Sequence, residues 1–182
     1  VSLKPDLVLV AGSRDYETQV EKDLARLGIP AWVSGPATVA EVLEDIKALS
    51  QVLGVEKKGD ELVEELSREL EAVRAAIPQE SERPKVFIAI DSELWTCGKG
   101  SFIDDVIAIA GGINIAGDVE QQYLQLSMED LLAKDPDVIL VAIPEDQAQA
   151  LSTRPGWSSL TVVKEGRVFF PNPDLISRPG PA

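Results

Sequence analysis

The chain alternates between short apolar runs and longer segments whose apolar residues recur every three or four positions. Continuous apolar runs of this length are typical of strands buried on both faces of a parallel sheet. They span residues 6–11, 29–33, 85–90, 138–143 and 166–170. The longer segments have the spacing of amphipathic helices. They span residues 15–27, 38–54, 57–77, 101–110, 127–132 and 145–151. The alternation of strands and helices predicts an α/β fold with parallel sheets.

The longest helical segment separates two such strand–helix units. Leu62, Leu66, Leu70 and Val73 lie on one stripe of residues 57–77. At 1.5 Å per residue, this segment spans roughly 30 Å. We therefore expect two parallel-sheet lobes joined by a single long α-helix. The predicted boundaries are an N-terminal lobe at 1–54, a connecting helix at 55–78 and a C-terminal lobe at 79–182.

Three hydroxyl residues are placed to begin helices. Thr38 stands three residues before Glu41, and Ser127 stands three residues before Asp130. This is the spacing of a capping box, in which the two side chains each accept a backbone N–H of the other residue. Ser101 follows a glycine-rich loop and is expected to cap the helix that runs to residue 110.

Composition narrows the function classes. The 182 residues carry a formal net charge of −14, with no histidine and one cysteine. So acidic a surface repels phosphate backbones and anionic lipid, so we expect no nucleic-acid partner. Without histidine, the chain cannot build a Ser-His-Asp triad or a His-ligated zinc site. No signal peptide is visible, but the chain starts at Val1 without Met, so a targeting sequence could have been removed.

A glycine-rich loop, Gly98 to Ser101, lies between a strand and a helix. Such a loop can present free N–H groups to an anion. It is not a Walker A loop, because Glu93 and Gly100 stand where that motif needs Gly and Ser or Thr. For nucleotide binding we favour a flexible loop capped by Ser101. Whether the loop lines a cleft stays open.

Carboxylates are numerous but show no diagnostic spacing. In so acidic a chain most are expected to be solvated. An oxygen-ligand metal site around Asp104, Asp105 and Asp118 is the alternative, but no EF-hand-like spacing supports it, so no metal site is predicted. The carboxylates include Asp91, Glu93, Asp104, Asp105, Asp118 and Glu120. Cys97 lies near a helix start, but no histidine base is available to it, so we expect a spectator thiol.

Three aromatic or basic residues could face a ligand. Trp95 lies in the expected loop after a strand, and ligands of open α/β sheets bind beyond the carboxyl ends of strands. Its indole could stack on a planar or macrocyclic ligand, or it could be a half-buried side chain that packs within the protein. Both interpretations stay open. Tyr123, expected in a loop, and Arg178, before Pro-Gly-Pro, could face the same cleft.

Several phrases, taken in order, match one family. They are Leu3 to Val10, Leu27 to Pro30, Gly98 to Asp104, Ala110 to Ala116, Ser127 to Leu132, Lys134 to Leu140, Pro155 to Trp157, Gly166 to Val168 and Arg178 to Pro181. The ordered set resembles the class III, helical-backbone substrate-binding proteins of ABC importers, the family that carries cobalamin, iron–siderophores and haem. Each phrase alone is weak, but the set covers nearly the whole chain.

The resemblance implies a fold and a function. The fold is two α/β lobes joined by one long helix, with ligand held in the cleft between them. The function is capture of a metal chelate and delivery to the permease of an ABC importer, with no catalysis and no catalytic cofactor. For this function, aromatic and basic residues of the cleft would hold the ligand. The candidates are Arg14, Tyr16, Trp95, Lys99, Tyr123 and Arg178.

The resemblance also implies a partner and a location. Glu17, and with less support Glu145, are the expected contacts to the permease, and such pairs steer docking electrostatically. The parent protein is expected to be extracytoplasmic, in the periplasm or lipid-anchored at the cell surface.

Two departures from the family pattern stand out. The family has elements before the Lys-Pro-Asp phrase at residues 4–6 and a helical segment after residue 181. We therefore expect a fragment with an incomplete first lobe. An exposed sheet edge or apolar patch there would invite a homodimer.

A second function class stays open from the residues. It is a cytosolic α/β enzyme or cofactor chaperone that uses Asp91 and the Gly98–Ser101 loop on a phosphorylated or metal-bearing substrate. Fold alone does not decide between the two classes.

Overall fold

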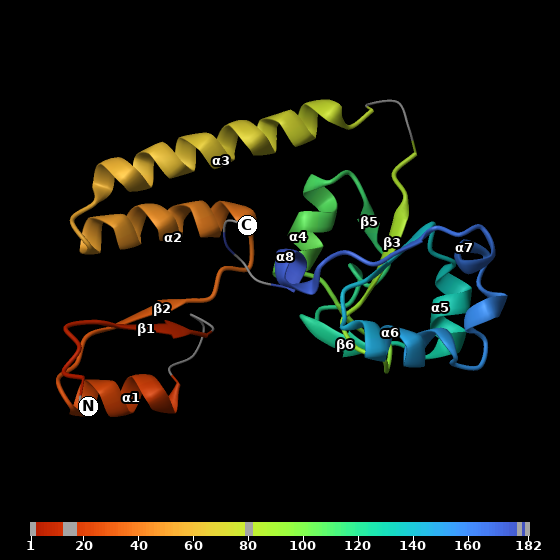
Figure 1. Ribbon diagram of the computed structural model, residues 1–182, viewed down its shortest axis with the longest axis horizontal. Coiled ribbons are helices and arrows are strands. Elements are labelled where there is room, and N and C mark those ends of the chain that lie inside the picture. The colour runs from red at the N-terminus through yellow and green to blue at the C-terminus, as the bar shows by residue number, and fades with distance from the viewer. Residues whose placement is uncertain (1–2, 13–17, 79–81, 178–179, 181–182) are drawn as a thin grey trace.

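The computed structural model describes residues 3–12, 18–78, 82–177 and 180. It contains three small sheets with helices packed around them (Figure 1). Two of the sheets are parallel, which confirms the predicted α/β class with parallel sheets. None of the helices in these ranges is long and apolar enough to cross a membrane.

The N-terminal part of the chain forms a two-stranded parallel sheet and a helical hairpin. Its elements are β1 (Val8–Ala11), α1 (Gln19–Arg26), β2 (Ala31–Ser34), α2 (Val39–Val52) and α3 (Glu56–Ala76). β1 and β2 pair from Val8 opposite Ala31 to Ala11 opposite Ser34. No residue of α1 is fully buried, and Leu9 on β1 is 59% exposed.

α2 and α3 pack closely along each other. Gly59 of α3 is buried against Ser50 of α2, and a Cβ added to Gly59 would lie 2.2 Å from the Ser50 hydroxyl. Glycine is therefore required for this approach of the two helices. α3 is the predicted long helix, displaced by one residue from the predicted range of 57–77.

The C-terminal part holds the main sheet. Its elements are β3 (Lys85–Ala89), β4 (Trp95–Cys97), α4 (Phe102–Ile109), β5 (Ile113–Asn114), β6 (Tyr123–Gln125), α5 (Met128–Lys134), β7 (Val138–Val141), α6 (Glu145–Ser152), the 3-10 helix η1 (Trp157–Ser159), α7 (Thr161–Lys164), β8 (Val168–Phe169) and α8 (Pro173–Ser177). Four strands form a parallel sheet in the order β5-β3-β7-β8. β3 lies inside this sheet, and four consecutive residues of it are buried because helices cover both faces.

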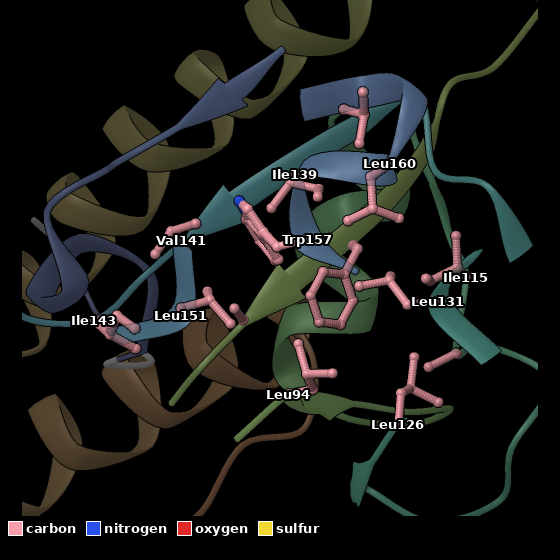
Figure 2. Close-up of a cluster of buried hydrophobic side chains, with 14 of the residues drawn as sticks. Leu94, Ile115, Leu126, Leu131, Ile139, Val141, Ile143, Leu151, Trp157 and Leu160 are labelled. Atoms are coloured by element: carbon pink, nitrogen blue, oxygen red, sulfur yellow. The ribbon is translucent and has the colours of Figure 1, made fainter. Parts of the chain in front are cut away.

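Both hydrophobic cores of the described residues lie in this part. The larger core fills the face covered by α5, α6, η1 and α7, and includes Phe87, Leu131, Ile139, Leu151 and Trp157 (Figure 2). The smaller core packs α4 on the other face through Ile103 and Ile107. The main sheet therefore gives a rigid support to the loops at its carboxyl edge.

Candidate functional site

A two-stranded antiparallel ladder extends from the carboxyl end of β3. β4 pairs with β6, with Trp95 opposite Gln125 and Cys97 opposite Tyr123. The Ile90 N–H donates to the Trp95 carbonyl at 3.0 Å, which ties the ladder to the end of β3. Residues opposite each other share a face, and alternate residues along a strand do too. Trp95 and Tyr123 therefore project from the same face, and they are 40% and 59% exposed.

The expectation that Trp95 and Tyr123 lie in loops is wrong. Each begins a strand of three residues. Strands this short are below the length at which an alternating pattern can be read from sequence. The register of the ladder is what brings the two aromatic side chains to one face.

The turn before Trp95 is fixed by the Asp91 carboxylate. Its Oδ1 accepts the Glu93 N–H at 2.7 Å and the Trp95 N–H at 3.0 Å. Arg154 supports the turn from outside, donating to the Ser92 carbonyl and pairing with Glu93, both at 2.9 Å. Asp91 therefore holds the backbone that presents Trp95.

The Gly98–Ser101 loop has no free N–H group to offer an anion. The N–H groups of Gly98 and Lys99 donate to the carbonyls of Gln122 and Val119 at 3.0 and 2.9 Å. The Gly100 N–H donates to the Asp104 carboxylate at 3.2 Å, and the Ser101 N–H donates to the Gly98 carbonyl at 3.3 Å. The loop is held by the facing chain and by α4, and Ser101 is the N-cap of α4, as predicted.

Lys99 lies beside the ladder but is already paired. Its Nζ lies 2.6 Å from the Glu120 Oε1, and this hydrogen bond raises the pKa of Lys99. Trp95, Lys99 and Tyr123 thus come from two facing segments, residues 95–100 and 119–125. Burial raises the pKa of the Tyr123 phenol, with a smaller effect from Cys97, so the phenol stays protonated at neutral pH.

A buried polar network supports this arrangement. The Asn114 Nδ2 donates to the Cys97 carbonyl at 2.8 Å and to the Asp104 Oδ1 at 2.9 Å, and its Oδ1 accepts the Ala116 N–H at 3.0 Å. Asn114 is 8% exposed. It therefore joins β4, α4 and β5 at one point. Sequence reasoning missed this role because Cys97 and Asp104 lie 17 and 10 residues from Asn114.

Cys97 is fully buried in the smaller core. Burial raises the pKa of its thiol to about 12, so the neutral form dominates at physiological pH. This agrees with the predicted spectator thiol. Among the described residues, no group of three or more Cys, Asp or Glu is placed to hold a metal ion.

A groove of about 720 Å³ lies at the carboxyl ends of β7 and β8. One wall is residues 143–152 around α6, and the other is residues 170–173. Phe170, 65% exposed, lies on the second wall, and Glu145 lies at the start of α6. Sequence reasoning missed Phe170; its signal is an aromatic pair at a strand end followed by Pro-Asn-Pro. Four predicted site residues, Arg14, Tyr16, Glu17 and Arg178, lie outside the described residues.

Known proteins resemble the chain over its whole length. An uncharacterised ABC transporter substrate-binding lipoprotein, YvrC of Bacillus subtilis, is 32% identical over 187 residues, covering 100% of this chain and 59% of that protein. A vitamin B12-binding protein of Vibrio cholerae serotype O1 is 26% identical, covering 100% of this chain and 65% of that protein. The chain therefore spans about three-fifths of the length of these relatives.

The fold is also found among solved structures. A possible iron-binding, periplasmic solute-binding protein of Staphylococcus epidermidis matches with a TM-score of 0.80 and 25% identity, covering 98% of this chain and 72% of that one. The sequence model of the family described as periplasmic binding protein matches residues 1–175. This chain belongs to the periplasmic binding protein family.

Proposed function

We propose that the protein captures a metal chelate between its two sheet-containing parts and delivers it to an ABC importer. One observation carries the proposal: Trp95 and Tyr123 project, half exposed, from one face of a ladder at the carboxyl edge of the main sheet. Ligands of open α/β sheets bind beyond this edge. Two exposed aromatic side chains on one face suit a large organic ligand with apolar surface better than a small ion.

The orientation of the sheets supports the same site. The carboxyl ends of β1 and β2 point toward the C-terminal part, and β3 runs down toward β4 and β6 (Figure 1). The loops after the strands of both parts therefore approach the same region. Arg14, Tyr16 and Arg178 lie outside the described residues and stay proposed ligand contacts on the basis of the sequence alone.

The similar proteins support the ligand class by their names. One is a vitamin B12-binding protein, and another is a possible iron-binding protein. Cobalamin, haem and ferric siderophores share a metal held in an organic ligand that presents apolar or aromatic surface. The proposed ligand is therefore one of these chelates, transported unchanged.

The hydrogen bonds of the site weigh against the enzyme or cofactor chaperone. That alternative needs free N–H groups in the Gly98–Ser101 loop and a free Asp91. All four N–H groups are bonded within the protein, and Asp91 accepts two backbone N–H groups. A phosphorylated substrate would have to displace these bonds before it could bind.

The partner and the location are proposed on the same basis. The B. subtilis relative is named as a substrate-binding lipoprotein of an ABC transporter, and the family is that of periplasmic binding proteins. Both support an extracytoplasmic parent protein that docks on a permease. Glu145, exposed at the start of α6, stays the proposed contact from the C-terminal part.

Calorimetric titration of the chain with cobalamin, haem and ferric siderophores tests this proposal. One chelate should bind saturably, and Trp95→Ala should weaken its binding roughly tenfold by removing the stacking surface. Tyr123→Ala should act in the same direction. Ile113→Ala, which truncates an exposed apolar side chain on the edge strand β5 and outside the ladder, is the matched control and should leave affinity unchanged.

Two results would count against the proposal. No heat of binding from any chelate, with inorganic phosphate giving a saturable response, would favour the enzyme or cofactor chaperone. Binding that is equally strong in Trp95→Ala, Tyr123→Ala and Ile113→Ala would place the ligand elsewhere.

A further inference from the structure

A hydrogen bond joins the N-terminal and C-terminal parts of the chain beside the region where the carboxyl ends of their sheets approach. The Val39 N–H, at the first position of α2, donates to the Asp105 Oδ2 at 2.8 Å. Asp105 lies in the first turn of α4, 66 residues away in sequence. The right-hand end of α2 therefore meets the start of α4 in Figure 1.

The bond suits both helices. The first N–H groups of a helix lack partners within the helix, and its N-terminus attracts negative charge. At the start of α2, Thr38 accepts the Glu41 N–H at 3.1 Å and Glu41 accepts the Ala37 N–H at 2.8 Å. Neither of these capping bonds uses the Val39 N–H, which donates to Asp105. A charged acceptor makes this bond stronger than one between neutral groups.

Apolar packing around the bond is loose. Phe102 lies three residues before Asp105, so both project from one face of α4. Phe102 borders a mostly apolar cavity of about 250 Å³, which is also lined by α2, α3 and Gly180. Loosely packed side chains do not fix one position of α2 and α3 against α4, because they can shift into the unfilled space. A hydrogen bond has a preferred distance and direction, so it can fix their relative position.

We propose that Asp105 is a positioning residue that fixes how the N-terminal part sits against the C-terminal part. Val39 follows the loop after β2, and Asp105 follows the Gly98–Ser101 loop after β4. The bond thus connects the two loops that would form opposite walls of the ligand site. Its loss would leave each part folded but allow their separation to vary.

Distances between two spin labels, one on each part, test the proposal. The labels are placed at Lys22→Cys in α1 and Ala133→Cys in α5, both exposed positions. Cys97 is buried, and a labelled chain without the added cysteines checks that it stays unmodified. The parent pair should give one narrow distance distribution, and Asp105→Ala should broaden it or shift its maximum.

A second variant removes the same bond from the other side. Val39→Pro deletes the N–H donor at a helix position that proline favours. Thr38 already has the extended backbone that a residue before proline adopts, with φ −136° and ψ 159°. Val39→Pro should broaden the distribution as Asp105→Ala does, and the double variant should broaden it no further.

Two control variants separate the effect of losing this hydrogen bond from the effect of losing a negative charge. Asp105→Asn keeps an oxygen that can accept the Val39 N–H, so it should retain the narrow distribution. Asp60→Ala, an exposed aspartate on α3, should leave the distances unchanged. An unaltered distribution in Val39→Pro overturns the proposal, whether or not Asp105→Ala changes it. No ligand is present in these measurements, so their result does not depend on whether a chelate binds.

Discussion

Asn114 shows how a single side chain can organise the ligand-facing loop. Its three hydrogen bonds join the end of β4, the first turn of α4 and the backbone after β5. A buried polar side chain with all its partners is stabilising, whereas its removal leaves those partners unpaired in a dry site. Substitution of Asn114 therefore lowers the stability of the fold by leaving the Cys97 carbonyl and the Ala116 N–H without the hydrogen bonds that Asn114 makes to them.

We expect Asn114→Ala to lower the free energy of unfolding by about 2–3 kcal/mol. The measurement is urea denaturation followed by circular dichroism. Gln122→Ala is the control, because Gln122 is exposed and makes one long bond of 3.4 Å to the Gly100 carbonyl. Its effect should stay within about 0.5 kcal/mol. Equal effects of the two substitutions would show that the network does not stabilise the fold.

Candidate site residues could be predicted from sequence where their neighbours along the chain indicated their position in the fold. Trp95 is a candidate because it follows a predicted strand, and Tyr123 because it lies in an expected loop; both side chains are exposed in the structure. Their shared face could not be predicted, because it depends on the register between β4 and β6. The supporting roles of Asn114 and Asp105 could not be predicted, because Cys97 lies 17 residues from Asn114 and Val39 lies 66 residues from Asp105.

The helix caps are the elements that sequence predicted best. Ser127 and Asp130 form the expected capping box, with the Asp130 carboxylate accepting the Ser127 N–H at 3.2 Å. At Thr38 only half of the expected box is present, since the Glu41 carboxylate bonds the Ala37 N–H in place of the Thr38 N–H. The long helix was predicted to within one residue because its stripe is long. β4, β5 and β6 were missed because each has three residues or fewer.

The α5 capping box should make stability depend on pH. The bonds from the Ser127 side chain and backbone lower the pKa of Asp130 from its ordinary value of 3.8. A carboxyl group whose pKa is lower in the folded state contributes stability above its unfolded pKa, and loses it as pH falls through the folded pKa. The unfolding free energy should therefore fall below about pH 4, and less steeply in Asp130→Asn.

Urea denaturation between neutral pH and pH 3 measures this difference. Glu129→Gln is the matched control, because it removes a carboxylate from the same turn of α5 without touching the box. It should leave the pH dependence of the parent unchanged. A parallel loss of pH dependence in both variants would point to general charge repulsion in this acidic chain.

The whole molecule has an uneven distribution of buried apolar surface. The larger core includes fully buried Phe87, Leu131 and Ile139, whereas no residue of α1 is buried and Leu9 is exposed. The homodimer expected from sequence gains no support from the similar proteins, and the boundaries at 54 and 78 stay a prediction.

Hydrogen exchange should follow this distribution. Amides of β3 and β7 should exchange at least about tenfold more slowly than those of β1 and β2, because local opening costs less where little surface is buried. Mass spectrometry of peptides after deuterium labelling measures both regions at once. Leu131→Ala should speed exchange in β3 and β7 while leaving β1 and β2 unchanged. Equal protection of both sheets in the parent chain would contradict this account.

The fold class and the family could be predicted from sequence because they rest on many weak signals in a fixed order. The groove beside Phe170 could not be predicted, since it forms where α6 meets residues 170–173, a segment that is distant in sequence. The family resemblance, now confirmed by the match over residues 1–175, supplied the candidate ligand class.

The bond between Val39 and Asp105 also has a mechanical consequence. A body attached at one point can swing in any direction, whereas a body attached at two points keeps one easy rotation, about the line that joins them. The N-terminal part is joined to the C-terminal part by the chain between α3 and β3, and α2 is bonded to α4 through Val39 and Asp105. If the proposal above holds, the easiest rotation of one part against the other is about the line that joins these two points, and a bound ligand would change their angle about that axis.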